Sequence, residues 1–114
     1  MKLSDLYNSL KAVNGIPSDH VAFGKTGKIV PLPALIYDVT SENGLAADNH
    51  LYVKGFKSFE VELYTRRYDA TLEEAVEAQL DSLSIVYSKV CSWETDSDAY
   101  LIVWSFEEFI EPEN

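Results

Sequence analysis

Residues 48–65 read DNHLYVKGFKSFEVELYT, and this stretch decides the fold. Its second half, FEVELY, alternates apolar and acidic side chains with a period of two. That is the pattern of a strand with one face on a core and the other in water. The first half keeps the period in a different phase, and Gly55 lies where the phase changes, which predicts a β-bulge or sharp bend. We therefore expect one long bent strand over about residues 50–65.

The other elements can be placed around this strand. Apolar residues at helical spacing predict a helix over residues 3–13, which Asn14-Gly15 ends. Thr71 and Glu74 form a capping-box pattern, which predicts a second helix from Thr71 to about residue 83. Strands are expected at 21–23 (short), 34–39, 85–93 and 99–106, with a turn-rich loop at 40–49 and a fraying acidic tail at 107–114. The chain is thus expected to be one α+β domain, residues 1–114, with an antiparallel sheet of about four strands, two helices packed on it and a C-terminal hairpin.

Charge is distributed unevenly along the chain. The net charge is −10, and all of it comes from residues 71–114, in which Lys89 is the single base. In the second helix, four acids fall on the side opposite the apolar residues, namely Glu73, Glu74, Glu77 and Asp81. This acidity argues against nucleic-acid binding through phosphates. No run of about 18 apolar residues is present that would cross a membrane.

The sequence contains no convincing catalytic, cofactor or metal pattern. Gly24-Lys25-Thr26 resembles part of a phosphate loop, but position 19 is Asp where that motif requires Gly. Asp38, Glu42, Asp48 and His50 do not have the spacing of a calcium loop. The single Cys91 cannot form an intramolecular disulfide, and we expect it to pack as a small apolar side chain. We therefore expect a protein that is not an enzyme and has no catalytic residue, cofactor or metal.

The stretch ADNHLYVKGFKSFEVELYTRRYD, followed by the helix TLEEAVEAQLDSL, resembles a family of small proteins from tailed bacteriophages and prophages. Further similar features are the N-terminal MKLSDLYNSLKAV and the proline-rich VPLPALIY. The family is the tail-completion or tail-terminator type of long-tailed phages, which lies where the tail tube meets the head connector. The resemblance implies an α+β subunit that is monomeric in isolation and forms a hexameric ring around the DNA channel on assembly. It brings no catalytic residue, and residues 19–28 have no counterpart in the family.

With this resemblance, the charge distribution suggests where a ring subunit would make its contacts. A near-neutral half carrying Arg66 and Arg67 and an acidic half suit head-to-tail association. We expect the assembly interface to include these two arginines and the 40–49 loop, with Glu42, Asn43, Asp48 and Asn49. The acidic face of the second helix or the final hairpin would line the channel.

The resemblance also sets the expected partners and location. The partners are tail-tube and head-connector proteins, without sequence-specific nucleic-acid binding or a membrane. The expected location is the bacterial host cytoplasm during assembly and then the virion. The alternative is an acidic DNA mimic that inhibits a basic host or phage protein.

Overall fold

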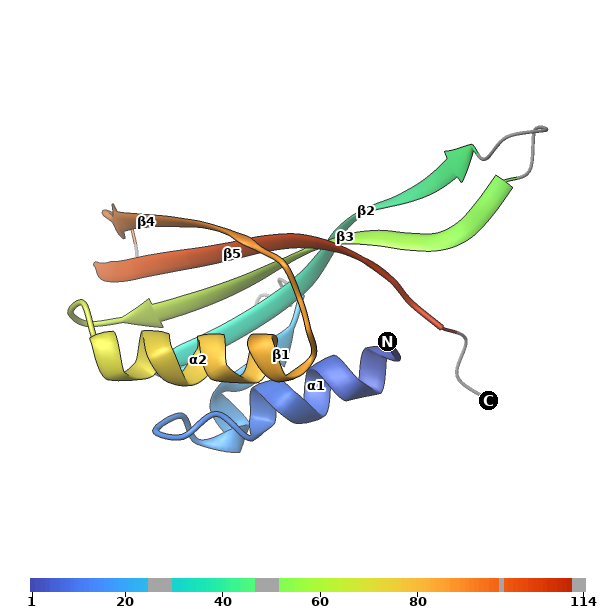
Figure 1. The fold of residues 1–114 in the computed structure, drawn as a ribbon. Coiled ribbons are helices and arrows are strands. Elements are labelled where there is room, and N and C mark those ends of the chain that lie inside the picture. The colour runs from blue at the N-terminus through green and yellow to red at the C-terminus, as the bar shows by residue number, and fades with distance from the viewer. Residues whose placement is uncertain (25–29, 47–51, 97, 112–114) are drawn as a thin grey trace.

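The fold is a five-stranded sheet with two helices on one of its faces (Figure 1). The computed structural model describes residues 1–24, 30–46, 52–96 and 98–111. The elements are α1 Leu3–Lys11, a 3-10 helix at Ser18–His20, β1 Val21–Phe23, β2 Ala34–Ala46, β3 Tyr52–Thr65, α2 Ala70–Ser82, β4 Ser88–Glu94 and β5 Ala99–Phe109. The strand order is β1-β2-β3-β5-β4, and every pair is antiparallel except β1 with β2. The predicted α+β class is confirmed.

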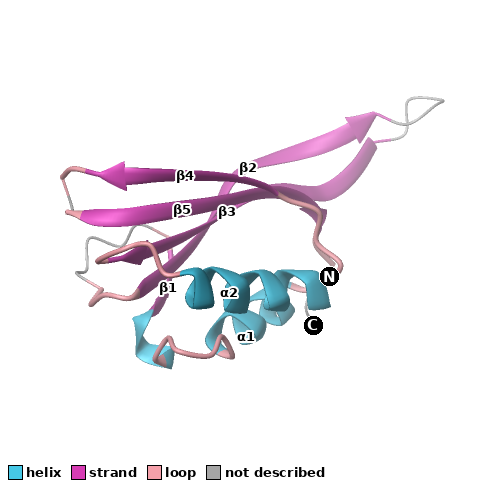
Figure 2. Ribbon diagram, turned by 60° about the vertical axis from the view of Figure 1, so that its left-hand side comes forward, coloured by secondary structure: helices cyan, strands magenta, loops and turns pink. Residues whose placement is uncertain are grey.

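The alternation along β3 determines which face the helices cover. Phe59, Val61 and Leu63 are almost fully buried, whereas Glu60 and Glu62 between them are partly exposed. Figure 2 shows both helices on one face of the sheet and none on the other. Apolar residues of β3 therefore pack under the helices, and its acids lie on the uncovered face.

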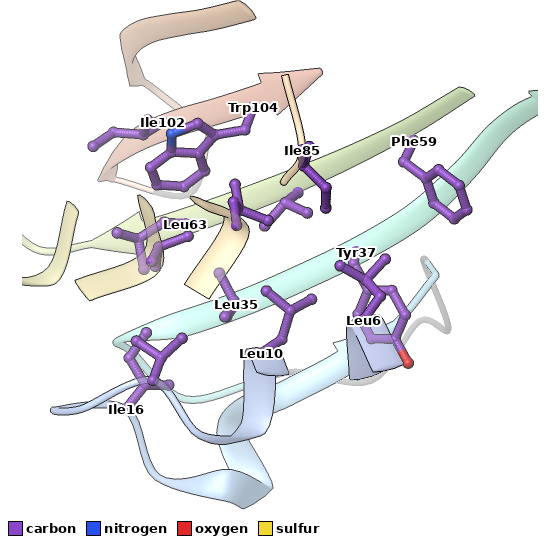
Figure 3. Packing of buried hydrophobic residues seen from close by; sticks show 14 of the residues in the cluster. Leu6, Leu10, Ile16, Leu35, Tyr37, Phe59, Leu63, Ile85, Ile102 and Trp104 are labelled. Carbon is purple, nitrogen blue, oxygen red and sulfur yellow. The ribbon is translucent and has the colours of Figure 1, made fainter. Parts of the chain in front are cut away.

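The hydrophobic core lies between the helices and this covered face (Figure 3). Cross-strand pairs such as Phe59 with Phe106, whose rings stack at 5.3 Å, continue the core from β3 into β5. The largest fully buried side chains are Trp104, Phe59, Leu6, Leu10, Leu35, Leu63, Leu80, Ile102, Val61 and Val76. Burying a side chain of this size stabilises a fold by about 1.5–3 kcal/mol. This core joins both helices to β2, β3 and β5.

The long strand β3 has the predicted bulge near Gly55. Asn43 pairs with Phe56 and Leu45 with Val53, so β3 advances three residues while β2 advances two. A second shift, between Val39 and Ser41, leaves Thr40 as an extra residue in β2. Such insertions bend and twist the strands that carry them.

The expected loop at residues 40–49 is wrong for its first seven residues, because β2 continues to Ala46. Pairing with β3 satisfies the backbone there, and the bulge at Thr40 lets a turn-rich sequence remain in the ladder. Residues 47–51 lie outside the described residues. The result is a β2–β3 ribbon that projects beyond the helix-covered part of the sheet (Figure 1), in a molecule of 50 × 27 × 26 Å.

Helix α2 begins earlier than predicted. Asp69 is its N-cap, since its carboxylate accepts the Leu72 amide at 3.1 Å, and Thr71 lies inside the first turn. The predicted capping box at Thr71 and Glu74 is therefore wrong. Asp69, which lies two residues before Thr71 and has an extended backbone, supplies the cap instead. An Asp carboxylate serves this role as well as a Thr hydroxyl.

The end of α2 also explains why β4 begins at Ser88 and not at residue 85. Ser84 has a φ of 58°, and the Ile85 amide donates to the Leu80 carbonyl at 3.1 Å. These features close the helix in a Schellman motif, which keeps Ile85 in the core. Helix α1 likewise ends at Lys11, two residues before the predicted end.

The acidic tail does not fray over its first residues, contrary to the prediction. Strand β5 continues to Phe109, where Glu107 and Glu108 pair with Ser58 and Lys57. The Glu111 amide then donates to the Met1 carbonyl at 2.9 Å. Pairing with β3 and with the N-terminus therefore orders residues 107–111, and residues 112–114 lie outside the described part of the chain.

Candidate functional site

Two of the four acids expected on the exposed side of α2 are instead held against the sheet. Glu73 is only 8% exposed and Glu77 is partly buried, while Glu74 and Asp81 are exposed. The expectation of a single exposed acidic face is therefore wrong. The reason is that α2 lies beside β4, which carries Lys89 on the covered face opposite Trp104.

Lys89 connects the two retained acids. Its Nζ lies 3.0 Å from Glu73 Oε2 and 2.8 Å from Glu77 Oε2. Trp104 Nε1 donates to Glu77 at 2.9 Å, and the Tyr68 hydroxyl donates to Glu73 at 2.6 Å. The two carboxylates, which would repel each other at i,i+4 spacing, thus share a base and two neutral donors.

The charge states of this network follow from its contacts. The hydrogen bond from Tyr68, together with Lys89, lowers the pKa of Glu73 despite its burial. Hydrogen bonds to Glu77 and Glu73 raise the pKa of Lys89. Glu73 and Lys89 are therefore both charged at neutral pH. The network joins α2 to β4 and β5. We assign it a structural role.

The uncovered face of the sheet has an acidic surface that sequence reasoning did not select as a site. Asp38 pairs with Glu60, and Glu62 lies two residues along the same strand. The Tyr64 hydroxyl donates to Glu62 at 2.8 Å. Burial raises the pKa of this hydroxyl, and Glu62, Glu94 and Glu60 raise it further. The pairing of the strands places all three of these acids on the same face as Tyr64.

Bases do not accompany these acids. The uncovered face continues onto β5 through Leu101, Val103, Ser105 and Glu107. Among the residues whose side chains are described, no Lys or Arg of β1–β5 shares this face, because Lys57 and Lys89 alternate onto the other one. We call Asp38, Glu60, Glu62 and Glu94 the acidic sheet face. The alternation of apolar and acidic residues along β3 could have revealed this face. It was interpreted only as the side of the strand that meets water, and not as a possible binding surface.

The predicted assembly residues Arg66 and Arg67 lie at the end of β3, where both are exposed. The Thr65 hydroxyl donates to the Arg67 carbonyl at 2.6 Å and fixes the turn that carries them. Within the described chain, neither guanidinium has an acid within 4.0 Å. In a protein of net charge −10, this turn is a local positive site.

A surface cavity of about 720 Å³ opens beside this turn. Leu32, Pro33 and Leu72 contribute its apolar walls, and both arginines line it. Gly15, in the loop after α1, has a φ of 92°, and a Cβ there would lie 2.7 Å from Leu72 Cδ2. Glycine is therefore needed for the close approach of this loop to α2. We call this cavity with Arg66 and Arg67 the arginine pocket.

Two of the other predicted interface residues, Glu42 and Asn43, are not near the arginine pocket. Glu42 and Asn43 pair with Lys57 and Phe56 in the projecting ribbon, at the opposite end of β3. Asp48 and Asn49 lie outside the described residues. The structure thus separates the predicted interface into two ends of the molecule, and it does not form one patch.

The remaining candidates for chemistry are dispersed. Among the described residues, no three His, Cys, Asp or Glu side chains gather as metal ligands. Of the four residues considered for a cation, Asp48 and His50 lie outside the described part, as do Lys25 and Thr26 of the glycine triplet. Cys91 is exposed, contrary to the expected packing, because β4 is an edge strand that α2 covers only in part. Among the described helices, none is long and apolar enough to cross a membrane.

No protein-family model matches the chain, and no curated protein matches it in sequence. The functional interpretation therefore depends on the surfaces described above.

Proposed function

We propose that the protein is a structural subunit of a tailed phage or prophage virion, which joins or terminates the tail tube at the head connector. In this proposal six copies form a ring around the DNA channel. The observation that carries it is the acidic sheet face, an uncovered surface with Asp38, Glu60 and Glu62 and without a described base. The sequence resemblance of the 47–69 stretch supports the same role.

An acidic, uncovered face suits a channel through which DNA must move. Binding to DNA gains free energy when Lys or Arg displaces condensed counterions, and carboxylates offer no such gain. DNA can therefore pass this face without being held. The exposed acids of α2, Glu74 and Asp81, remain a second candidate lining, whereas Glu73 and Glu77 are engaged with Lys89.

The two ends of the molecule suit a ring. A ring needs two different contact surfaces on each subunit, because each copy meets the next head to tail. The arginine pocket lies at one end of β3, and the projecting β2–β3 ribbon with Glu42 and Asn43 lies at the other. The ribbon is a suitable element for contact with tail-tube and head-connector proteins. In this proposal the subunit is monomeric in dilute solution, is made in the host cytoplasm and ends in the virion.

The test is to assemble particles without this protein and examine them by electron microscopy. The expected result is tails of abnormal length, or separate heads and tails, with normal particles restored by the wild-type gene in trans. Purified protein should also bind isolated tail tubes of the phage that encodes it. Normal joined particles in its absence would show that the proposal is wrong.

The alternative of a DNA mimic draws on the same acidic sheet face. A mimic places its carboxylates in the basic groove of a nuclease or repressor, as a monomer or dimer. It should therefore bind a basic DNA-binding protein in a salt-sensitive manner and ignore tail tubes. Binding to tail tubes but not to basic proteins favours the joint.

A further inference from the structure

One exposed aromatic ring has acids on both sides. Phe109 is 37% exposed and packs edge-on against Phe56 at 5.6 Å. Glu107 and Glu111 lie two residues before and after it. The Glu111 carboxylate lies 3.9 Å from the Met1 amino group, and its side chain is still 54% exposed. Of the exposed large hydrophobic residues described, Phe109 alone has this arrangement. We call Glu107, Phe109 and Glu111 the acidic stripe.

Backbone contacts hold the acidic stripe in place. Phe109 pairs with Phe56 in the sheet, and the Met1 amino group donates to the Phe109 carbonyl at 3.4 Å. The Glu111 amide donates to the Met1 carbonyl at 2.9 Å. In β5, which ends at Phe109, the side chains of Glu107 and Phe109 lie on the same side about 6.6 Å apart. The stripe is therefore ordered before any contact, which reduces the entropy that binding must overcome.

The arginine pocket offers the complementary chemistry. Its walls are apolar at Leu32, Pro33 and Leu72, and neither arginine has a described acid within 4.0 Å. Asp69 also lines the pocket, and its carboxylate accepts the Leu72 amide as the N-cap of α2. Its volume, about 720 Å³, is within the range of about 300–1,000 Å³ in which pockets bind ligands. Guanidinium groups bind carboxylates with paired, directed hydrogen bonds. A phenyl ring flanked by carboxylates matches both features.

The pocket and the stripe of one molecule cannot meet. Thr65, just before the arginines, pairs with Tyr100 at the start of β5, and Phe109 lies nine residues farther along that strand. The two sites are therefore about 30 Å apart along a rigid sheet. Any contact between them must join two copies.

We infer that the arginine pocket of one copy receives the acidic stripe of a second copy, with the Phe109 ring in the cavity and Glu107 and Glu111 on Arg66 and Arg67. This inference rests on the proposed function, since it supplies the contact between neighbours in the ring. The contact is heterologous, so it can repeat from copy to copy until the ring closes.

Analytical ultracentrifugation of the purified chain, over a concentration series at low salt, tests this contact. The wild type should self-associate as its concentration rises, and added salt should weaken the association. The paired reversals Arg66→Glu/Arg67→Glu and Glu107→Lys/Glu111→Lys should each lower the association constant about tenfold or more, as expected for close charge pairs. Glu74→Lys/Asp81→Lys is the matched control, because it brings the net charge from −10 to −6 as the stripe reversal does.

Mixing the two reversed variants gives the decisive result. The arginine-reversed copy keeps a native stripe, and the stripe-reversed copy keeps a native pocket. The reversed pocket is acidic and the reversed stripe basic, so every contact in an alternating assembly is again complementary. The mixture should therefore associate while neither variant does so alone. Circular dichroism checks that each variant is folded, and Glu107→Gln/Glu111→Gln with Phe109→Ser serves if a reversal unfolds the chain.

Several outcomes would overturn the inference. These are a wild type that remains monomeric at the highest concentration, association that the reversals leave unchanged, and a mixture that does not associate. Saturable binding of inorganic phosphate at the pocket, with unchanged self-association of the arginine variant, would instead make the pocket a small-anion site.

If tail tubes bind the wild type while the reversals have no effect on self-association, the proposed function stands and the contact is wrong. If the predicted self-association occurs without tail-tube binding, the contact stands and the proposed function is wrong.

Discussion

The two faces of the sheet are built from alternate residues of the same strands, yet they have opposite properties. On β5, Trp104 is fully buried under the helices, while its neighbour Val103 is partly exposed on the uncovered face. On β3, Val61 is buried between Glu60 and Glu62. The covered face holds the fold together, and the uncovered face is available for function.

This difference shows that the face on which an acid lies, and not the helix or strand that carries it, decides whether its charge is exposed. Glu73 and Glu77 are acids of α2 that face the sheet, and both form an ion pair with Lys89. Glu60 and Glu62 are acids of a core strand, and they face away from every helix. Surface function therefore has to be assigned by the direction of each side chain.

The largest effect should follow from breaking the covered face. Trp104→Ala removes a fully buried indole and its hydrogen bond to Glu77. The free energy of unfolding should fall by about 3–5 kcal/mol, as for other buried aromatic truncations. Val103→Ala, one residue away on the uncovered face, should cost about 1 kcal/mol or less. Urea denaturation of both variants measures the contrast, and equal losses would contradict the assignment of the two faces.

A smaller loss should follow from removing the base that joins α2 to β4. Lys89→Met leaves Glu73 buried and Glu77 without their shared partner. The free energy of unfolding should fall by about 1–3 kcal/mol, because each carboxylate keeps its neutral donor but loses its hydrogen bond from a charged one. Lys11→Met makes the same change in charge on the exposed end of α1, beside Tyr7, and should have little effect. Adding Glu73→Gln and Glu77→Gln to Lys89→Met should restore part of the stability if charge is the cause.

The stability that Glu73 contributes should depend on pH. Its pKa in the folded protein is lowered from 4.5 by the hydrogen bond from Tyr68 and by Lys89. A lowered folded pKa adds stability that is present above the unfolded pKa and is lost as the pH falls through the folded pKa. At pH 7, Glu73→Gln should therefore be about 1 kcal/mol less stable than the wild type.

Denaturation at a series of pH values tests this dependence. The difference in the free energy of unfolding between the wild type and Glu73→Gln should become smaller as the pH is lowered from 7 to 3. Glu74→Gln, an exposed neighbour on the same helix, is the control and should show no such change. If this difference stayed constant for Glu73→Gln, the contacts of Glu73 with Tyr68 and Lys89 would not favour its ionised form.

Local patterns predicted the covered face well. The alternation of residues 59–64 gave β3 and its buried side, and the phase change at Gly55 gave the bulge. Both features depend only on residues close in sequence, because side chains of a strand alternate regardless of their partners. The α+β class followed from the same periodicities.

Contacts between distant residues account for what the patterns missed. Strand pairing with β3 overrides the turn signals at residues 40–46. Lys89 lies 16 residues from Glu73, so no helical pattern could show that it removes this acid from the exposed side. The arginine pocket joins loops near residues 15, 32 and 66, which only the assembled fold brings together. The uneven charge along the sequence was enough to select the two arginines. The acidic sheet face could be recognised only once the pairing of the strands showed which acids lie on the same side of the sheet.

The smallest effect on stability, and the sharpest on function, should follow from reversing charge on the acidic sheet face. Glu60→Lys/Glu62→Lys also relieves the repulsion between Glu60 and its cross-strand partner Asp38, so the free energy of unfolding should change by less than about 1 kcal/mol. If this face lines the channel, particles complemented with the variant should join normally but deliver DNA poorly, since lysines in every subunit would hold the passing duplex. Counting joined particles by electron microscopy and plaques by titre separates the two steps. Glu74→Lys/Asp81→Lys makes the same change in charge on the exposed side of α2, so the variant that lowers the ratio of plaques to joined particles identifies the surface that DNA passes. Full infectivity with the sheet-face variant would place that face outside the channel, whatever the helix variant does.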